Sequence, residues 1–266
     1  MYPALFQIGP IEVRSYYTLW AFALLLFLVW TKRRAVKRYG IDADDVASVL
    51  LWVYFSAIIG AMVFGFFEKL PTLIRHPEVF AGDISRGGLS SGGGILCGGL
   101  GGIYRTRKLG VSLNDFAEAA SLPMAFMLSV GRIGCFLEGC CLGFGAFSVN
   151  PSACSVHFPF DSPGFYRFPA QMSESIAALL IGILLFIIEK YAPKRGIKIG
   201  GGTAILWPLF NILYGAYRLI FDGFRELAPG MAFRMGHFLG LVSLLLGIAW
   251  LYWTYRTRKR ENEALL

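Results

Sequence analysis

Residues 131–143, Gly-Arg-Ile-Gly-Cys-Phe-Leu-Glu-Gly-Cys-Cys-Leu-Gly, place two charged side chains, Arg132 and Glu138, at the end of a long apolar segment. A guanidinium is costly inside a membrane, so Arg132 is expected to face protein or water and to pair with an anion. That anion is either an internal carboxylate or a phosphate. The choice between the two decides whether this arginine is structural or part of a binding site.

A second polar group lies on and just after the apolar segment 200–222. Its members are Asn211, Tyr214, Arg218, Asp222 and Arg225, at spacings of three, four, four and three. These spacings put all five on one helical face. An ion pair between Arg218 and Asp222 would explain two of them by simple helix locking. We favour instead a cavity that these residues line together with Arg132 and Glu174, because two or three arginines suit a phosphate-bearing substrate.

The elements that carry these residues are apolar enough for a membrane. The chain of 266 residues is 56% hydrophobic and only 16% charged, with a mean hydropathy of +0.57, which a soluble domain could hardly bury. Seven segments approach the roughly 20 residues that a spanning helix needs: 16–31, 46–67, 88–104, 113–137, 171–189, 200–222 and 235–255. We therefore predict an all-α integral membrane protein with about seven transmembrane helices in a single domain over residues 1–266.

Glycine runs begin two of these segments, Gly92–Gly94 in the third and Gly200–Gly202 in the sixth. Small residues let membrane helices pack closely. We therefore expect both runs to lie in helix–helix contacts.

Most of the 25 lysines and arginines follow the first, third and fifth segments or lie in the C-terminal tail. The positive-inside rule then places the N-terminus outside and the C-terminus in the cytoplasm. The net charge of +8 would contact anionic membrane lipids, and nucleic-acid binding is a poor interpretation of it. Two outer loops follow from this topology: residues 68–87, and a periplasmic cap over about residues 138–168 that directly follows the Arg132 segment.

Four of the five cysteines are expected near the outer face, and Cys97 in an apolar helix is best explained by packing. Disulfides persist in oxidising compartments, so Cys154 paired with Cys140 or Cys141 would staple the cap. A metal site is not expected, because His157 is the only histidine nearby and no standard zinc spacing is present. Cys135 shares a helical face with Arg132, which leaves a catalytic thiol as a further, less favoured role.

Five short motifs occur in one order along the chain: Ile8-Gly9-Pro10-Ile11 followed by Tyr16, Gly87-Gly88-Leu89-Ser90-Ser91, Gly131-Arg132-Ile133-Gly134, Pro169-Ala170-Gln171-Met172-Ser173-Glu174, and Tyr214-Gly215-Ala216-Tyr217-Arg218. This order resembles the prolipoprotein diacylglyceryl transferase family over essentially the whole chain. The resemblance implies a multi-pass enzyme of the bacterial inner (cytoplasmic) membrane. It also implies transfer of a diacylglyceryl group from phosphatidylglycerol to the lipobox cysteine thiol at the signal peptide of prolipoproteins, with release of glycerol phosphate and no cofactor.

The same resemblance suggests roles for individual residues. Arg132 and Arg218 match the family's two motif arginines and would stabilise the phosphate that leaves, while Tyr214 would orient the donor or relay a proton. Residues expected to bind or arrange the substrate are Tyr16, Gly92, Glu138, Gln171, Glu174, Asn211, Asp222 and Arg225.

The chain departs from the family at several of these positions. Gly92 stands where the family motif continues with a histidine, the usual candidate for activating the thiol, and Cys135 stands where the family has asparagine. A thiol could ionise without a dedicated base beside arginines, since a positive environment lowers a cysteine pKa, or Glu138 or Tyr214 could act as the base. The departures also allow a transferase with the same donor and another acceptor, or a lipid-binding protein without catalysis.

Overall fold

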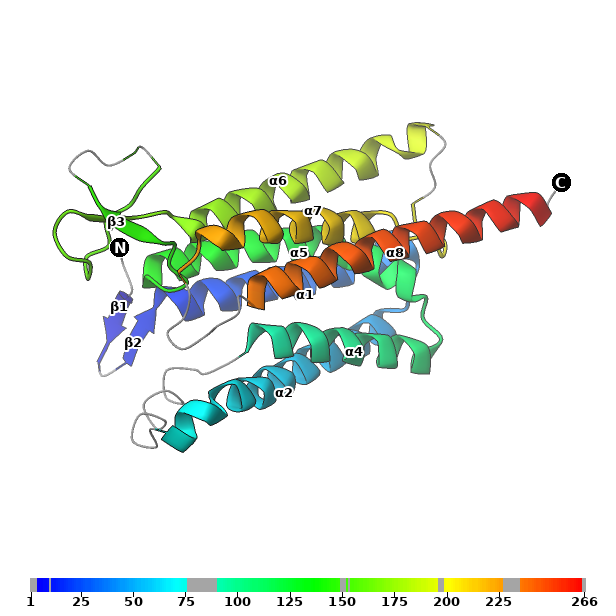
Figure 1. Ribbon diagram of the computed structural model, residues 1–266. Helices are drawn as coiled ribbons and strands as arrows, with labels where there is room; N and C mark the ends of the chain where they lie inside the picture. The colour runs from blue at the N-terminus through cyan, green and yellow to red at the C-terminus, as the bar shows by residue number, and fades with distance from the viewer. Residues whose placement is uncertain are drawn as a thin grey trace. The chain divides into compact units, whose positions relative to one another are not determined.

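The computed structural model describes residues 4–9, 11–75, 90–148, 152, 154–195, 199–226 and 235–264. Seven α-helices lie in this part of the chain (Figure 1): α1 Ser15–Tyr39, α2 Ala43–Arg75, α4 Ser91–Leu109, α5 Leu113–Glu138, α6 Ala170–Tyr191, α7 Leu206–Phe221 and α8 Met235–Ala264. Each predicted segment overlaps one of these helices, so the predicted helical class is confirmed.

Four helical stretches are long and apolar enough to cross a membrane. They are Ala43–Phe67, Leu113–Glu138, Ala170–Tyr191 and Gly236–Arg258. A membrane protein is therefore supported, while seven crossings and the orientation of the chain stay predictions.

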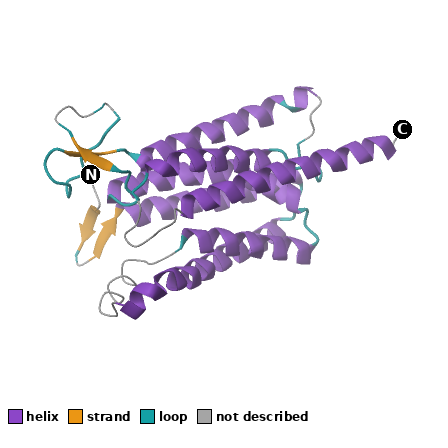
Figure 2. Ribbon diagram, in the orientation of Figure 1, coloured by secondary structure: helices purple, strands orange, loops and turns teal. Residues whose placement is uncertain are grey.

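Two small antiparallel sheets, which the sequence analysis did not predict, accompany the helices (Figure 2). Strand β1 (Ala4–Ile8) pairs with β2 (Ile11–Arg14) immediately before α1, and β3 (Gly145–Phe147) pairs with β4 (Phe165–Arg167) between α5 and α6. Two short 3₁₀ helices follow longer helices, η1 (Pro193–Arg195) after α6 and η2 (Asp222–Phe224) after α7.

The chain divides into two compact units, one of Met1–Arg34 with Ala117–Leu266 and one of Ala35–Phe116. The predicted single domain over residues 1–266 stays a prediction. In the second unit α2 packs along α4. A Cβ added at Gly93 would meet the Gly60 carbonyl oxygen and the Phe64 side chain, and one at Gly98 would lie 3.0 Å from the Ala57 Cβ. The first glycine run therefore lies in a close helix–helix contact, as predicted.

The core of the first unit is formed by α5, α6 and α7. Its buried side chains are Leu122, Ala125, Ile181, Leu185, Leu206 and Phe210. Helix α7 also packs against α8, so closely that a Cβ at Gly215 would lie 2.6 Å from the Leu244 backbone nitrogen. The polar residues of α7 are thus held between α6 and α8.

Two predicted boundaries were wrong. Gly200, Gly201 and Gly202 have φ angles of 85°, 63° and 84° and form a turn, so the sixth helix begins only at Leu206. Left-handed backbone of this kind favours glycine, and the run serves a turn rather than helix packing. Residues 68–75, predicted to be loop, continue α2, because the sequence stays apolar at Leu70 and Ile74. Residues 76–87 of that loop lie outside the described residues.

Candidate active site

The motif Gly-Arg-Ile-Gly fixes Arg132 on α5 close to α1. A Cβ at Gly131 would lie 2.8 Å from ring carbons of Trp20, and one at Gly134 would lie 3.2 Å from the Leu19 Cβ. Both glycines therefore allow the close approach of the two helices. The arginine between them is held on the remaining face, directed away from this contact.

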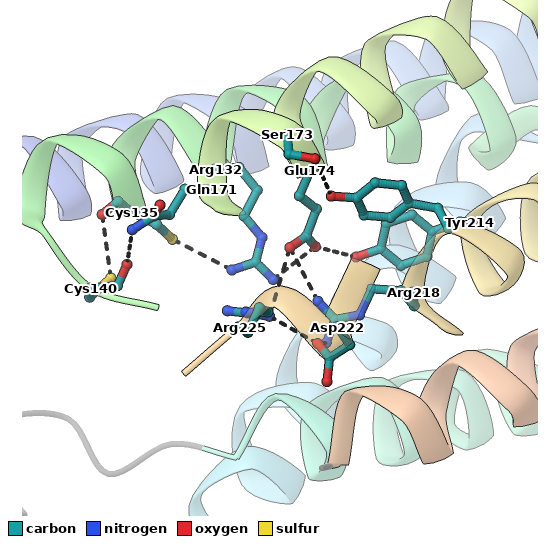
Figure 3. Close-up of polar contacts among 11 residues, drawn as sticks. Arg132, Cys135, Cys140, Gln171, Ser173, Glu174, Tyr214, Arg218, Asp222 and Arg225 are labelled. Carbon is teal, nitrogen blue, oxygen red and sulfur yellow. Dashed lines mark hydrogen bonds and ion pairs between the residues drawn. The ribbon is translucent and has the colours of Figure 1, made fainter. Parts of the chain in front are cut away.

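The carboxylate of Glu174 on α6 is the centre of the polar site (Figure 3). It is 2% exposed, and its Oε1 lies 2.9 Å from Nη2 of Arg132 and accepts a hydrogen bond of 2.5 Å from the hydroxyl of Tyr214. Its Oε2 lies 3.1 Å from Nη1 of Arg218 and 3.8 Å from Nη1 of Arg225. One buried carboxylate on α6 thus gathers two guanidinium groups and a phenol from α5 and α7, and a third guanidinium group from Arg225, directly after η2.

A second carboxylate, Asp222, joins the same group. Its Oδ1 lies 2.9 Å from Nη2 of Arg218 and 3.6 Å from Nη1 of Arg225. We call the six residues Arg132, Glu174, Tyr214, Arg218, Asp222 and Arg225 the arginine cluster. The ion pair between Arg218 and Asp222 is present, as the simpler helix-locking interpretation predicted. It is, however, one part of a larger network that includes Arg132 and Glu174.

The arginine cluster carries one positive charge more than its carboxylates neutralise. Its three guanidinium groups are mostly buried, with side chains 12 to 18% exposed. Within the described part of the chain, Nε of Arg132 is buried without a hydrogen-bond partner, and Nη1 of Arg132 approaches only the sulfur of Cys135, at 3.9 Å. A buried donor without a partner costs about 1–3 kcal/mol, so an anion would find both charge and donors here.

Helix α8 covers the ion pair between Arg218 and Asp222. A Cβ at Gly236 would meet the Asp222 carboxylate and the Arg218 guanidinium, and one at Gly240 would lie 2.9 Å from the Arg218 Cβ. Glycine at both positions lets the start of α8 lie directly on these side chains. The position of Arg218 is therefore set by packing as well as by its ion pairs.

The segment after α5 holds Arg225 in place through its backbone. The Phe144 nitrogen donates to the Phe224 oxygen at 2.9 Å, and the Glu226 nitrogen donates to the Leu142 oxygen at 2.9 Å. Arg225 lies between these two bonds and forms an isolated bridge with Gly143. The predicted cap thus positions one member of the arginine cluster.

Arg167 on β4 ties this segment together from the other side. Its Nε donates to both carboxylate oxygens of Asp161, at 2.9 and 2.8 Å, and its Nη1 lies 2.9 Å from Oε2 of Glu226. The hydrogen bonds to Asp161 raise the pKa of Arg167 above its ordinary value. The guanidinium therefore stays charged and joins the residue after Arg225 to the cap.

Several predicted site residues lie outside the arginine cluster. The Gln171 Nε2 donates to the Cys140 oxygen at 2.6 Å, and Glu138 pairs with Arg14 at 2.9 Å. Asn211 donates to the Trp207 oxygen and accepts from the Ser243 hydroxyl, at 2.8 and 3.1 Å. These contacts serve helix ends and the α7–α8 interface, so the predicted polar face of α7 contributes to the cluster without Asn211.

Two further predicted site residues, Tyr16 and Gly92, form no hydrogen bond or ion pair with the arginine cluster among the described residues. The Tyr16 ring packs edge-on against Tyr17, with centroids 5.3 Å apart, and lies 6.4 Å from the Trp20 ring. Gly92 lies in the first turn of α4, in the second unit.

All five cysteines are free thiols in the structure. The predicted disulfide from Cys154 to Cys140 or Cys141 is therefore not formed. The sulfurs of Cys135, Cys140 and Cys141 instead lie within 4.8 Å of one another. Hydrogen bonds from the Cys135 and Cys140 thiols lower the pKa of Cys141, and nearby Arg132 and Arg225 act in the same direction.

Sequence reasoning also missed a buried ion pair at the other end of α6. Arg34, one of the basic residues after the first apolar segment, donates to both oxygens of Glu189, at 2.9 and 2.7 Å. It also donates to the backbone oxygens of Ala119 and Glu118, and the Glu118 carboxylate accepts from the first turn of α7. The signal was a glutamate near the end of an apolar helix, which needs a partner when buried.

Fold and site together define an all-helical membrane protein with a buried, positively charged group of arginines between its helices. The chain belongs to a family described as prolipoprotein diacylglyceryl transferase, whose model matches residues 3–253. The predicted family is therefore confirmed.

Relatives from several bacteria agree with this family. The chain is 30% identical over 257 residues to a protein of Geobacter sulfurreducens, a match that covers 92% of each chain. It is 28% identical over 275 residues to one of Francisella tularensis, covering 98% of this chain and 96% of the relative. Both relatives are named phosphatidylglycerol–prolipoprotein diacylglyceryl transferase. These names support the predicted reaction and its class, a transferase.

Proposed function

We propose that this chain transfers a diacylglyceryl group from phosphatidylglycerol to the lipobox cysteine thiol of prolipoproteins. Family membership supports the reaction, and the arginine cluster supports the donor. The observation that carries the assignment is the imbalance of this cluster, three guanidinium groups against two carboxylates, all mostly buried. A phosphodiester brings a negative charge to this excess of positive charge.

In the proposed reaction, the acceptor sulfur attacks the glycerol carbon that bears the phosphate. The bond between that carbon and its ester oxygen breaks, and the electron pair leaves with glycerol phosphate. Negative charge grows on the leaving phosphate, where Arg132 and Arg218 would stabilise it. Donors already in place in a site with little water are worth more than the same donors in water.

Glu174 holds the guanidinium groups of this site together. Three like charges repel, and a buried carboxylate bonded to Arg132 and Arg218 offsets that repulsion. The Tyr214 hydroxyl bonds to the same carboxylate. We assign Glu174 and Asp222 to positioning the arginines, and Tyr214 to orienting Glu174 and, through it, the donor phosphate.

The enzyme would act in the bacterial inner membrane. We propose seven crossings by the seven helices, with the N-terminus outside and the C-terminus in the cytoplasm. The basic residues after α1, α4 and α6 support this orientation. The segment between α5 and α6 would then cover the site from the periplasm, where lipobox peptides arrive.

The test is an assay with purified full-length protein, phosphatidylglycerol and a lipobox peptide. The expected products are a peptide thioether, seen as the mass of the added diacylglyceryl group, and glycerol phosphate in equal amount. A peptide with serine in place of the lipobox cysteine is the control and should give neither product. Donor that binds but yields no thioether under any acceptor-peptide condition would contradict the proposal.

A second candidate function is transfer from the same donor to another acceptor. The observation that favours it is Gly92, at the position where the resemblance implies a histidine, the usual candidate for activating the thiol. Release of glycerol phosphate that depends on added membrane extract, with no peptide thioether, would indicate this function. The same result would exclude a protein that only binds lipid.

A further inference from the structure

Three cysteines meet at the end of α5, beside the arginine cluster. The helix ends in a Schellman motif: the Gly139 nitrogen donates to the Phe136 oxygen at 3.2 Å and the Cys140 nitrogen to the Cys135 oxygen at 3.1 Å, with Gly139 at φ 76°. This motif places the side chain of the residue after the glycine against the side chain five positions earlier. Here those two residues are Cys140 and Cys135, so the helix end itself brings two sulfurs together.

The third sulfur depends on an unusual backbone conformation. Cys141 has φ 57° and is the one non-glycine residue with positive φ in the described part of the chain. Such a conformation is costly and is often found at functional sites. This conformation directs the Cys141 side chain toward Cys135 and Cys140, so that all three sulfurs lie within 4.8 Å of one another. The Gln171 side chain on α6 bonds to the Cys140 oxygen at 2.6 Å and fixes the turn.

We propose that Cys135, Cys140 and Cys141 bind a Zn²⁺ ion with three thiolates and leave its fourth position open for a thiol. Zinc prefers tetrahedral thiolate coordination with zinc–sulfur distances of about 2.3 Å, which places two sulfurs about 3.8 Å apart. The three sulfurs lie within 4.8 Å of one another. No two of them therefore have to approach by more than about 1 Å to reach that geometry.

The surroundings suit such an ion. Three thiolates and one Zn²⁺ carry a net charge of −1, and Arg132, whose Nη1 lies 3.9 Å from the Cys135 sulfur, supplies a neighbouring positive charge. Cys135 is 2% exposed whereas Cys141 is exposed. The open position therefore faces the accessible side. Three protein ligands plus one open position is the arrangement of catalytic zinc sites, whereas structural sites use four.

The proposed role of the ion rests on the proposed function. The acceptor thiol binds the open position and loses its proton to water, because a thiol bound to zinc is deprotonated. The sulfur lone pair then forms the bond to the glycerol carbon while the carbon–oxygen bond breaks and its electrons leave with glycerol phosphate. The thioether product is a poor ligand and leaves the ion. This chemistry supplies the thiolate that Gly92 cannot generate.

The first experiment measures metal and needs no activity. Full-length protein purified in detergent with a non-chelating reductant should carry about one zinc per chain by elemental analysis. The variants Cys135→Ser, Cys140→Ser and Cys141→Ser should each lose it, while Cys97→Ser and Cys154→Ser should keep it. Equal zinc content in all six proteins would overturn the site, and so would zinc-free protein in which two of the three thiols are oxidised to a disulfide.

A second experiment tests the open position. Cobalt substituted for zinc should show thiolate charge-transfer bands, and its visible spectrum should shift when a lipobox peptide binds, but not when the serine peptide is added. An unchanged spectrum with bound cobalt would overturn the activating role. If the role holds, zinc removal lowers thioether formation by roughly 10²-fold or more, whereas phosphatidylglycerol still binds. A zinc-loaded protein that gives no thioether at all contradicts the proposed function and not the zinc site, because the zinc content is measured without any activity assay.

Discussion

Helices α5 and α6 each carry buried charges near both ends, and the two ends differ in how those charges are matched. At one end Arg34 meets Glu189 with Glu118 nearby, and at the other Arg132 meets Glu174 within the arginine cluster. Arg34 uses Nε, Nη1 and Nη2 in hydrogen bonds, two of them to one carboxylate. Arg132 has one close carboxylate contact, and its buried Nε has no partner among the described residues.

The difference separates a structural ion pair from a binding site. A fully bonded pair with no excess positive charge has nothing to offer a ligand, and its loss is a loss of stability. A group with excess positive charge and an unmatched donor is costly unless an anion completes it. Burial alone does not distinguish them, because Arg34 and Arg132 are similarly covered, at 10% and 16% exposure.

The largest expected effect is on stability at the Arg34 end. Arg34→Met removes two hydrogen bonds from the buried Glu189 carboxylate and should lower the free energy of unfolding by about 3–5 kcal/mol. Transfer activity per folded molecule should stay unchanged, because this pair lies outside the arginine cluster. Thermal unfolding in detergent, followed alongside the activity of the folded fraction, measures both.

A paired replacement provides the control. Arg34→Met combined with Glu189→Leu removes both charges and should recover most of the stability, since apolar replacements of buried pairs are often neutral. If Arg34→Met instead abolishes transfer in fully folded protein, the Arg34 end is also functional and the comparison fails.

The second effect is on catalysis at the Arg132 end. Arg132→Ala should lower kcat/KM for thioether formation by about 10²–10³-fold, the usual loss when one transition-state donor is removed. The unfolding temperature should change little, because removal of Arg132 leaves Glu174 still paired with Arg218. The matched measurement on Arg34→Lys, which keeps a buried positive charge at the other end, should show nearly full activity.

Saturation with phosphatidylglycerol sharpens this result. A variant whose activity returns at high donor concentration has lost only donor binding, so the phosphate contact would be the same in the ground state and the transition state. An Arg132→Ala protein with unimpaired turnover would remove the arginine cluster from the mechanism.

Helix positions were predictable because apolar length decides them, and each of the seven segments overlaps a helix. Their ends were less predictable, since local backbone chemistry sets them. The glycine run Gly200–Gly202 illustrates this: the same residue type packs helices at Gly93 and forms a left-handed turn at Gly201. Nothing in composition distinguishes the two uses.

In the site, helical periodicity correctly grouped Tyr214, Arg218, Asp222 and Arg225, whereas Glu174 was assigned to the same cavity and to the site by the family resemblance. Periodicity could not show that Asn211 turns to Ser243 on α8, because that choice depends on a neighbouring helix. The disulfide prediction was wrong for a similar reason. Spacing rules for disulfides and zinc ignore helix ends, whereas the glycine at 139 brings Cys135 and Cys140 together.

A smaller effect is expected at Tyr214. Tyr214→Phe removes a hydrogen bond to the charged Glu174 carboxylate, worth about 1.5–3 kcal/mol, so kcat/KM should fall roughly ten- to a hundredfold. Tyr217 on the same helix is the matched control. Its hydroxyl bonds to the neutral Ser173 hydroxyl at 3.0 Å, so Tyr217→Phe should cost about 0.5–1.5 kcal/mol of stability with little change in transfer. Equal losses of transfer in both variants would mean that the bond from Tyr214 to the Glu174 carboxylate has no special role in the site.

The smallest effect is expected in the cap, where Glu226 pairs with Arg167 while 54% exposed. Exposed ion pairs contribute about 0.2–1 kcal/mol and are screened by salt. Glu226→Gln should therefore change thermal stability only slightly, and less at high salt. The backbone bond from Glu226 to Leu142 remains, so Arg225 keeps its place and transfer should change by no more than about twofold. If transfer instead falls as far as with Tyr214→Phe, the cap side chains, and not its backbone, position Arg225, and the arginine cluster extends to Glu226.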